Sequence, residues 1–406
     1  MPVYTSLETI RSAGVPVVIF GAGSSGEALY YAAKKSGIVV SGFADTYIPN
    51  ITRVNGALCG LPAIYSGDLP GKYGPETIFL VSANYISDHV HKLERLGFTR
   101  WFPGGELLKG FDLSEVPTFV RDFAHMRHSV EGTIDSHDAF LHPELLHMRS
   151  VEFQITERCS MNCDGCSNLM HLYQHPQNFG TAEILTWMDA FCRYIDRVGE
   201  ARVIGGEPFM NRDCAEIVRR CAEKPQFQRV TIFTNGTIPL KQEQLDLMSH
   251  PKVVFLITAY EGFKQRHDEI RAQLKANGIK CVYQEASGWT DCGHILPQQN
   301  RGDAELTEFF QTCCGNKLFT ISRGNLYRCS WNANAVGLGD VPDYEQDRVN
   351  LMQGGDIKEE LRRFMNDLPF LKACDFCPGR RLDDPEVTPG IQVPRLRPYA
   401  KLTQIG

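Results

Sequence analysis

The sequence has no long hydrophobic run and no dense block of lysine or arginine in its 406 residues. The first absence excludes a membrane-spanning helix, which needs about 20 consecutive apolar residues. The second absence, together with a formal net charge of −6, argues against nucleic acid, because phosphate backbones bind basic surfaces. We therefore expect neither a membrane nor a nucleic acid among the partners.

The first residues, MPVYTSLETIRSAG, lack the basic start and the apolar stretch of a secretory signal. We therefore expect a cytoplasmic protein, in which thiols stay reduced. Fourteen cysteines are many for such a chain. In a reducing compartment they favour metal or cluster binding over disulfide bridges. With 43% hydrophobic and 22% charged residues, the composition is that of an ordinary globular protein.

Residues 1–110 alternate between strand and helix patterns, with strands at 15–20 and 77–83 and another that ends at Asp45. Such alternation through short connections predicts a parallel α/β sheet. Residues 111–150 are rich in histidine and acidic residues and show weak periodicity, and we expect a connector with some helix there.

A second β/α series covers residues 151–300. Five strands are expected, at 151–156, 201–204, 229–233, 253–258 and 279–284. With a sixth strand nearby, they predict a partial, open (β/α)6 barrel. Sites in parallel β/α folds assemble at the carboxyl ends of the strands. Residues 301–380 are expected to form a small hairpin-and-helix domain, and residues 381–406 a C-terminal tail.

Three cysteines stand in one short stretch, TERCSMNCDGCSN, directly after the first strand of this series. Cys159, Cys163 and Cys166 have the spacing C-x3-C-x2-C. Three thiolates are one too few to close a four-iron cluster, which leaves one iron open to another ligand. A zinc site with His171 or His175 as the fourth ligand is an alternative that the same residues permit.

This stretch resembles the radical S-adenosylmethionine (SAM) superfamily, in which the methionine part of SAM chelates the open iron. The sequence GGEP at 205–208 is similar to that family's motif after the second strand. The resemblance implies a [4Fe–4S] cluster and a SAM site, and one departure is that Gly165 stands where the family usually has an aromatic residue beside adenine. The SAM contacts expected are Gly205, Gly206, Glu207, Pro208, Thr234, Asn235 and Thr258.

The stretch CCGNKLFTISRGNLYRC and a later CDFC resemble the twitch/SPASM extension of radical SAM enzymes. Two short strands flank Arg323-Gly324, which predicts a hairpin. The resemblance implies a second [4Fe–4S] cluster, with Cys314 favoured over Cys313, while zinc fits four thiolates equally well. The expected ligands are Cys314, Cys329, Cys374 and Cys377. The remaining cysteines are expected to be packing residues, namely Cys59, Cys192, Cys214, Cys221, Cys281 and Cys292.

The loop GAGSSG follows a strand and opens a helix, with an acidic residue at the end of the next strand. This is the pattern of a dinucleotide-binding loop. The segment also resembles the small Rossmann-like domain of nucleotide-sugar acyltransferases. We expect a nucleotide or nucleotide-sugar there, and the alternative is a purely structural unit. The residues expected to bind this ligand are Gly21, Gly23, Gly26 and Asp45.

Together these features predict a radical SAM oxidoreductase that oxidises or epimerises a sugar, cyclitol or nucleotide-sugar. The auxiliary cluster would carry an electron, and a flavodoxin- or ferredoxin-type protein would donate one. Two alternatives stay open, a peptide-modifying radical SAM enzyme and a zinc-stabilised nucleotide-sensing scaffold. Candidate catalytic residues near the expected rim are Tyr260, Glu261, Glu285 and Arg328.

Overall fold

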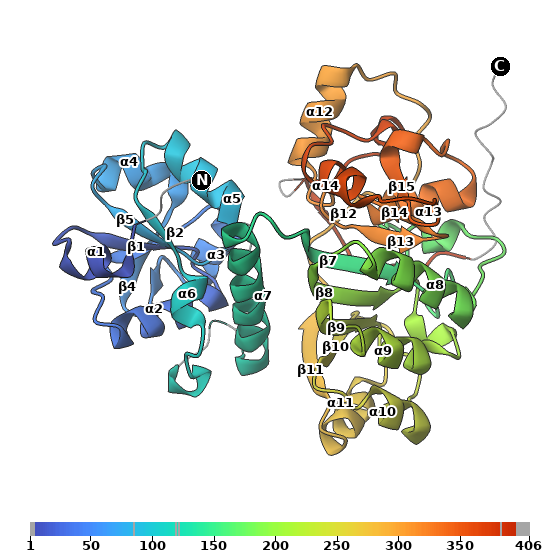
Figure 1. Cartoon of the computed structure of the whole chain (residues 1–406). Coiled ribbons are helices and arrows are strands. Elements are labelled where there is room, and N and C mark those ends of the chain that lie inside the picture. Colours follow the sequence, from blue (N-terminus) through green and yellow to red (C-terminus); the bar gives the residue numbers. More distant parts are fainter. Residues whose placement is uncertain (1–4, 84–85, 118–119, 121, 382–383, 395–406) are drawn as a thin grey trace. The chain divides into compact units, whose positions relative to one another are not determined.

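The computed structural model describes residues 5–83, 86–117, 120, 122–381 and 384–394. The chain divides into two compact units, Met1–Leu145 and Leu146–Gly406 (Figure 1). Both units are built on mainly parallel sheets with helices between the strands. The predicted α/β class is therefore confirmed. Within the described residues, no helix is both long and apolar enough to cross a membrane.

The first unit is a six-stranded sheet in the order β3-β4-β2-β1-β5-β6. All neighbours pair in parallel except β3 and β4. The central strands β1, β2 and β5 are buried along their whole length, as expected for a sheet with both faces covered. The strands are β1 (Val17–Phe20), β2 (Gly42–Asp45), β3 (Ala57–Leu58), β4 (Leu61–Tyr65), β5 (Ile78–Val81) and β6 (Trp101–Pro103).

The helices of this unit extend past the boundary expected at residue 110. Helix α7 packs on α2 and α6, and its Met126 and Val130 belong to the same apolar core as Ile19. The prediction that residues 111–150 form a connector is therefore corrected. The helices are α1 (Leu7–Ser12), α2 (Ser24–Lys35), α3 (Ile48–Arg53), α4 (Leu69–Lys72), α5 (Ile86–Arg95), α6 (Gly105–Leu108) and α7 (Phe123–Leu141).

The second unit contains an eight-stranded sheet in the order β11-β10-β9-β8-β7-β13-β14-β15. The five strands from β7 to β11 are parallel, as the sequence predicted. The sixth parallel strand is β13, which comes from the predicted hairpin and pairs with β7. Its bounds and those of its neighbours are β7 (His147–Gln154), β8 (Arg197–Ile204), β9 (Phe227–Thr234), β10 (Val253–Ala259), β11 (Lys280–Glu285), β13 (Thr320–Ser322), β14 (Asn325–Tyr327) and β15 (Arg348–Asn350).

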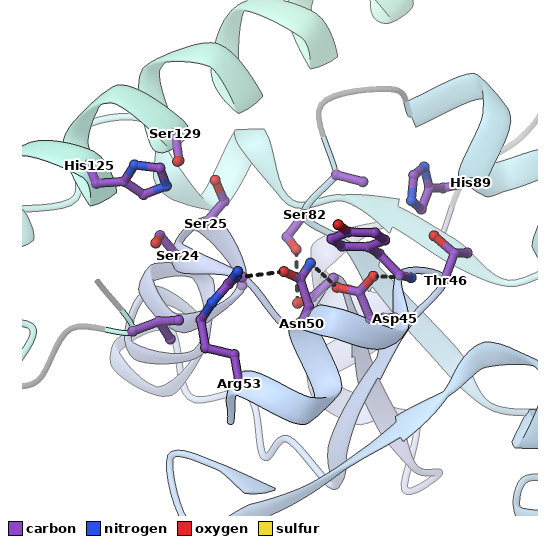
Figure 2. Close-up of a pocket in the computed structure, with 16 residues that line it drawn as sticks. Ser24, Ser25, Asp45, Thr46, Asn50, Arg53, Ser82, His89, His125 and Ser129 are labelled. Carbon is purple, nitrogen blue, oxygen red and sulfur yellow. Dashed lines mark hydrogen bonds between the residues drawn. The ribbon is translucent and has the colours of Figure 1, made fainter. Parts of the chain in front are cut away.

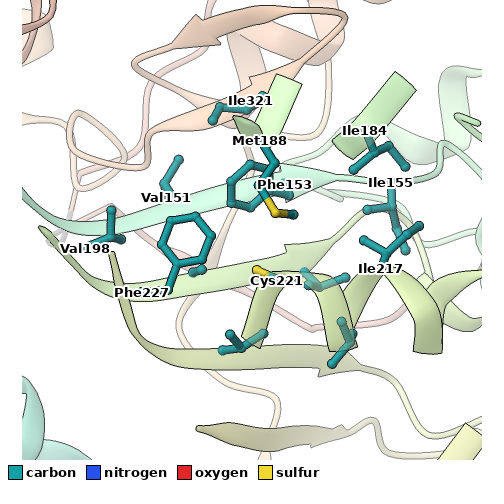
Figure 3. Packing of buried hydrophobic residues seen from close by; sticks show 14 of the residues in the cluster. Val151, Phe153, Ile155, Ile184, Met188, Val198, Ile217, Cys221, Phe227 and Ile321 are labelled. Atoms are coloured by element: carbon teal, nitrogen blue, oxygen red, sulfur yellow. The ribbon is translucent and has the colours of Figure 1, made fainter. Parts of the chain in front are cut away.

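Figure 3 shows the apolar core between this sheet and its helices. Val151 and Phe153 of β7 belong to one cluster with Ile184 of α8 and Ile217 of α9. Cys192, Cys214 and Cys221 are buried in the same cluster, in line with a packing role. The remaining elements are α8 (Thr181–Cys192), α9 (Cys214–Ala222), α10 (Gln242–Met248), α11 (His267–Ala276), α12 (Asp303–Thr312), α13 (Ser330–Leu338), α14 (Lys358–Asn366), β12 (Trp289–Thr290) and β16 (Glu386–Val387).

Candidate functional site

The loop after β7 brings Cys159, Cys163 and Cys166 together. Burial raises the pKa of the Cys159 thiol, and the nearby Cys166 thiol, the Glu207 carboxyl and the Cys163 thiol raise it further. Burial also raises the pKa of Cys163, to about 11, with Cys166 adding to the effect. Each thiol thus lies within electrostatic range of the others, as the spacing predicted.

Several N–H groups point at these sulfurs. Burial raises the pKa of Cys166, and hydrogen bonds from the backbone amides of Met170, Asn168 and Leu169 lower it. The side-chain amide of Asn235 donates to Cys159 Sγ at 3.8 Å. Such donors stabilise a thiolate, which is the form of cysteine that binds metal. The donor set therefore fits an iron–sulfur cluster held by three cysteines.

Two glycines allow the end of β8 to lie directly against the cysteine loop. A Cβ on Gly205 would stand 2.4 Å from the carbonyl oxygen of Thr156. A Cβ on Gly206 would stand 2.4 Å from the carbonyl oxygen of Arg158 and 2.7 Å from the Cβ of Cys159. The GGE motif is thus explained by backbone packing, before any ligand contact is considered.

Glu207 joins the ends of β8 and β9. Its fully buried carboxylate accepts hydrogen bonds from Thr234 Oγ1 and from the Asn235 amide, both at 2.8 Å. Burial raises the pKa of Glu207 to about 7, while these hydrogen bonds lower it. Pro208 begins a buried 3-10 turn, and the carbonyl oxygen of half-buried Thr258 accepts from Gln265. Direct contact of these residues with SAM stays a prediction.

Of the four candidate catalytic residues, only Tyr260 lies beside the cysteine loop. Burial raises the pKa of its hydroxyl above the usual range, and the thiols of the loop raise it further. Glu261 and Glu285 are exposed. Arg328 is buried, and its guanidinium donates to the carbonyl oxygens of Asn316 and Phe364, which is a structural role.

Gly165 adopts a φ of +70° and is covered by residues that the sequence did not single out. A Cβ on Gly165 would lie 3.8 Å from Val387 and 3.9 Å from the ring of Trp289. Trp289 also meets Tyr260 edge to face, with ring centroids 5.9 Å apart. An aromatic pair therefore stands next to the position where the resemblance led us to expect an aromatic residue.

A second set of thiols forms around Cys329, and it includes Cys313 rather than Cys314. Burial raises the pKa of Cys313 to about 12, with Cys329 as the strongest neighbouring charge. A Cβ on Gly315 would stand 3.6 Å from Cys313 Sγ and 4.0 Å from Cys329 Sγ. Cys374 and Cys377 both lie within electrostatic range of Cys329 and Cys313.

The Cys314 side chain points elsewhere, so the structure favours Cys313 over Cys314, and the choice of ligand stays a proposal. It is exposed, and its charged neighbours are Arg380 and Asp384. The Cys314 amide donates to the Arg380 carbonyl oxygen at 2.8 Å. Because successive side chains of an extended segment alternate in direction, the inward thiol is that of Cys313.

No three His, Cys, Asp or Glu side chains in the described ranges converge closely enough to hold a single metal ion. A zinc ion needs its ligands around one centre. A cubane cluster instead takes each thiolate on a different iron, and both clusters stay proposals.

The first unit contains a cavity of about 440 Å³ at the start of α2 (Figure 2). This volume lies in the range of about 300–1,000 Å³ found for small-ligand pockets. Gly21 and Gly26 are required by packing, since a Cβ would stand 2.2 Å from Ser82 Oγ and 2.0 Å from the Gly21 carbonyl oxygen, respectively. Gly23 faces open space, where a Cβ would meet only Asn50 at 3.9 Å.

Asp45 lines this cavity, but its carboxylate already accepts hydrogen bonds from other groups of the protein. Its carboxylate accepts from the Ala22 amide at 2.7 Å, the Tyr47 amide at 2.8 Å and the Asn50 side chain at 3.0 Å. Arg53, His89 and His125 also line the cavity, and sequence patterns did not indicate them. His125 belongs to α7, within the segment that was expected to be a connector.

Residues 153–282 match the family described as the Radical SAM superfamily. The chain contains a radical SAM domain. The matched segment includes the cysteine loop, GGEP and the Thr234–Gly236 turn, so the resemblance seen in these motifs is confirmed.

Curated relatives of the radical SAM domain have different activities. The chain is 32% identical over 108 residues to molybdenum cofactor biosynthesis protein 1 of Drosophila melanogaster, covering 25% of this chain and 19% of that protein. It is 28% identical over 141 residues to PqqA peptide cyclase of Methylocella silvestris, covering 31% and 36%. The chain thus spans well under half the length of these relatives.

Two solved structures show a distant likeness to the chain. BtrN in complex with AdoMet and 2-DOIA has 19% identity and a TM-score of 0.37, covering 55% of this chain and 84% of that chain. Streptococcus suis SuiB bound to S-adenosylmethionine has 14% identity and a TM-score of 0.31, covering 69% and 56%.

Proposed function

We propose that the chain is a radical SAM enzyme whose Cys159, Cys163 and Cys166 hold a [4Fe–4S] cluster with one open iron. The observation that supports this most strongly is the convergence of three thiols beside the Gly205–Glu207 turn inside the matched domain. When bound, the cluster and SAM supply a 5′-deoxyadenosyl radical that abstracts hydrogen from an unactivated C–H bond. Glu207 and Asn235 hold the neighbouring strand ends against the loop. Assay of 5′-deoxyadenosine in the reconstituted protein tests the proposal.

We further propose a second [4Fe–4S] cluster on Cys313, Cys329, Cys374 and Cys377. Amides of Gly315 and Gly379 donate to Cys313 Sγ at 3.3 Å and to Cys377 Sγ at 3.4 Å. Four cysteine ligands leave no open iron, so this cluster would carry an electron rather than bind substrate. A flavodoxin- or ferredoxin-type protein would supply electrons from outside.

For the substrate, we propose a small polar molecule such as a sugar, cyclitol or nucleotide-sugar, which is oxidised or epimerised. The sheet face opposite the apolar core supports this, because it is polar. Arg202 pairs with Glu200 at 2.6 Å and lies 3.6 Å from Glu152, and Thr231 donates to Glu200 at 2.6 Å. The likeness to PqqA peptide cyclase favours a peptide as the second candidate. A screen of both substrate classes that measures 5′-deoxyadenosine would separate them.

The cavity of the first unit supports a nucleotide or nucleotide-sugar as its ligand. We expect Gly23→Val to weaken binding at least about tenfold, because the side chain would fill the approach to the α2 amides. The φ of Gly23 is −96°, so valine introduces no backbone strain there. Calorimetry of the full chain with nucleoside diphosphate sugars, NAD and NADP measures the effect.

Gly71→Val is the matched control for this prediction. Gly71 also has open space around it and lies outside the residues that line the cavity. The control should bind like the original chain, and iron content should stay the same in both variants. Equal binding by Gly23→Val, or no nucleotide binding at millimolar concentration, would show that the unit is structural.

A further inference from the structure

Residues 386–393 run across the cysteine loop of the radical SAM domain. Glu386 and Val387 form β16, which pairs with β12. Further on, the Val393 amide donates to the Asn162 carbonyl oxygen at 2.8 Å, and the Asp164 amide donates to the Ile391 carbonyl oxygen at 2.7 Å. The segment therefore pairs with the loop as a short antiparallel strand, with Gln392 opposite Cys163.

The side chain of Gln392 uses both ends of its amide on this loop. Its Oε1 accepts from the Asn162 backbone amide at 2.7 Å. Its Nε2 donates to Cys163 Sγ at 3.2 Å and to the Gly390 carbonyl oxygen at 2.7 Å. The acceptor fixes the side chain, and the donor is thereby aimed at a cluster ligand.

The turn before Gln392 is also fixed. Gly390 has a φ of +78°, which favours glycine. A Cβ on Gly390 would stand 2.7 Å from the ring of Tyr260. The chain therefore passes the aromatic pair of Tyr260 and Trp289 before it reaches Gln392. The Gly390 turn and the hydrogen bond from the Asn162 amide together fix the direction of the Gln392 side-chain amide.

We propose that Gln392 is a positioning residue for the cluster held by Cys159, Cys163 and Cys166, which raises the reduction potential of that cluster through its bond to Cys163. The proposal rests on the proposed function, because it requires the cluster to be there. Hydrogen bonds to cluster sulfurs stabilise the extra negative charge of the reduced state, and so shift the potential upward.

The test is an EPR-monitored redox titration of the anaerobically reconstituted full chain. Gln392→Met is similar in length but cannot donate, and Gln392→Glu keeps an acceptor but places negative charge beside the sulfur. Both should lower the potential of this cluster, with glutamate giving the larger shift. The second cluster should titrate as before, because its sulfurs accept from Gly315 and Gly379.

Ile391→Ala is the matched control, since Ile391 is 53% exposed and its hydrogen bond to the loop is made by its backbone. It should leave both potentials unchanged. Selective loss of about four irons from either Gln392 variant, with Ile391→Ala intact, would also support a positioning role. Unchanged potentials in both Gln392 variants at full iron content would overturn this inference and leave the proposed function standing. A wild-type chain without a cluster on the three cysteines would instead remove the proposed function itself.

Discussion

Replacing Cys159, Cys163 and Cys166 together with alanine is expected to lower the iron content of the reconstituted protein from about eight to about four, with sulfide falling in parallel. The three thiols lie on one loop and receive N–H donors, and we propose them as the ligands of one cluster. Formation of 5′-deoxyadenosine should be abolished, because no open iron remains to bind SAM. Iron and sulfide assays, with chromatography of the nucleoside, measure both effects.

The control for this variant is Cys59→Ala with Cys281→Ala, two half-buried cysteines outside both thiol sets. Iron content and 5′-deoxyadenosine should stay as in the original chain. Full iron content in the triple variant, together with continued 5′-deoxyadenosine formation, would show that the cluster lies elsewhere.

The second prediction with a large expected effect distinguishes Cys313 from Cys314 as the ligand of the second cluster. Cys313→Ala should lose about four irons, since Cys313 Sγ faces Cys329, whereas Cys314→Ala should keep about eight. The two variants differ only in which neighbouring thiol is removed, so each is the control for the other. Cys313→Ala should still cleave some SAM but form no product, because the electron exit is lost.

Iron analysis and product assays of both variants show which of the two cysteines is a cluster ligand. Loss of iron by Cys314→Ala alone would contradict the placement of these thiols. Four irons with stoichiometric zinc in the original chain would instead favour a structural metal at Cys329, Cys374 and Cys377.

The sequence alone was sufficient to predict those features whose pattern lies within a short segment of the chain. The cysteine loop, the hairpin at Arg323-Gly324 and the parallel strand series follow from spacing, turn residues and apolar runs. The choice between Cys313 and Cys314 was not local, because it depends on the contact between the Cys314 amide and Arg380. A preference taken from the adjacent glycine could not include that contact.

Some helix was expected in residues 111–150, but the packing of α7 into the core of the first unit was missed, for a different physical reason. The buried side of this helix includes Thr133, which donates to Ser25 at 2.9 Å, and His137, which accepts from the Gly105 amide at 3.0 Å. Polar residues that are buried through hydrogen bonds weaken an apolar period. The segment 386–393 was missed because it pairs with a loop more than two hundred residues earlier, for which no short-range signal exists.

The central claim is that SAM binds the open iron of the cluster on Cys159, Cys163 and Cys166. EPR spectra of the reduced, reconstituted full chain before and after addition of SAM test it most directly. The account predicts that SAM changes the signal of one of two clusters, and that the triple alanine variant shows no change. A reduced wild-type spectrum that is identical with and without SAM would contradict it.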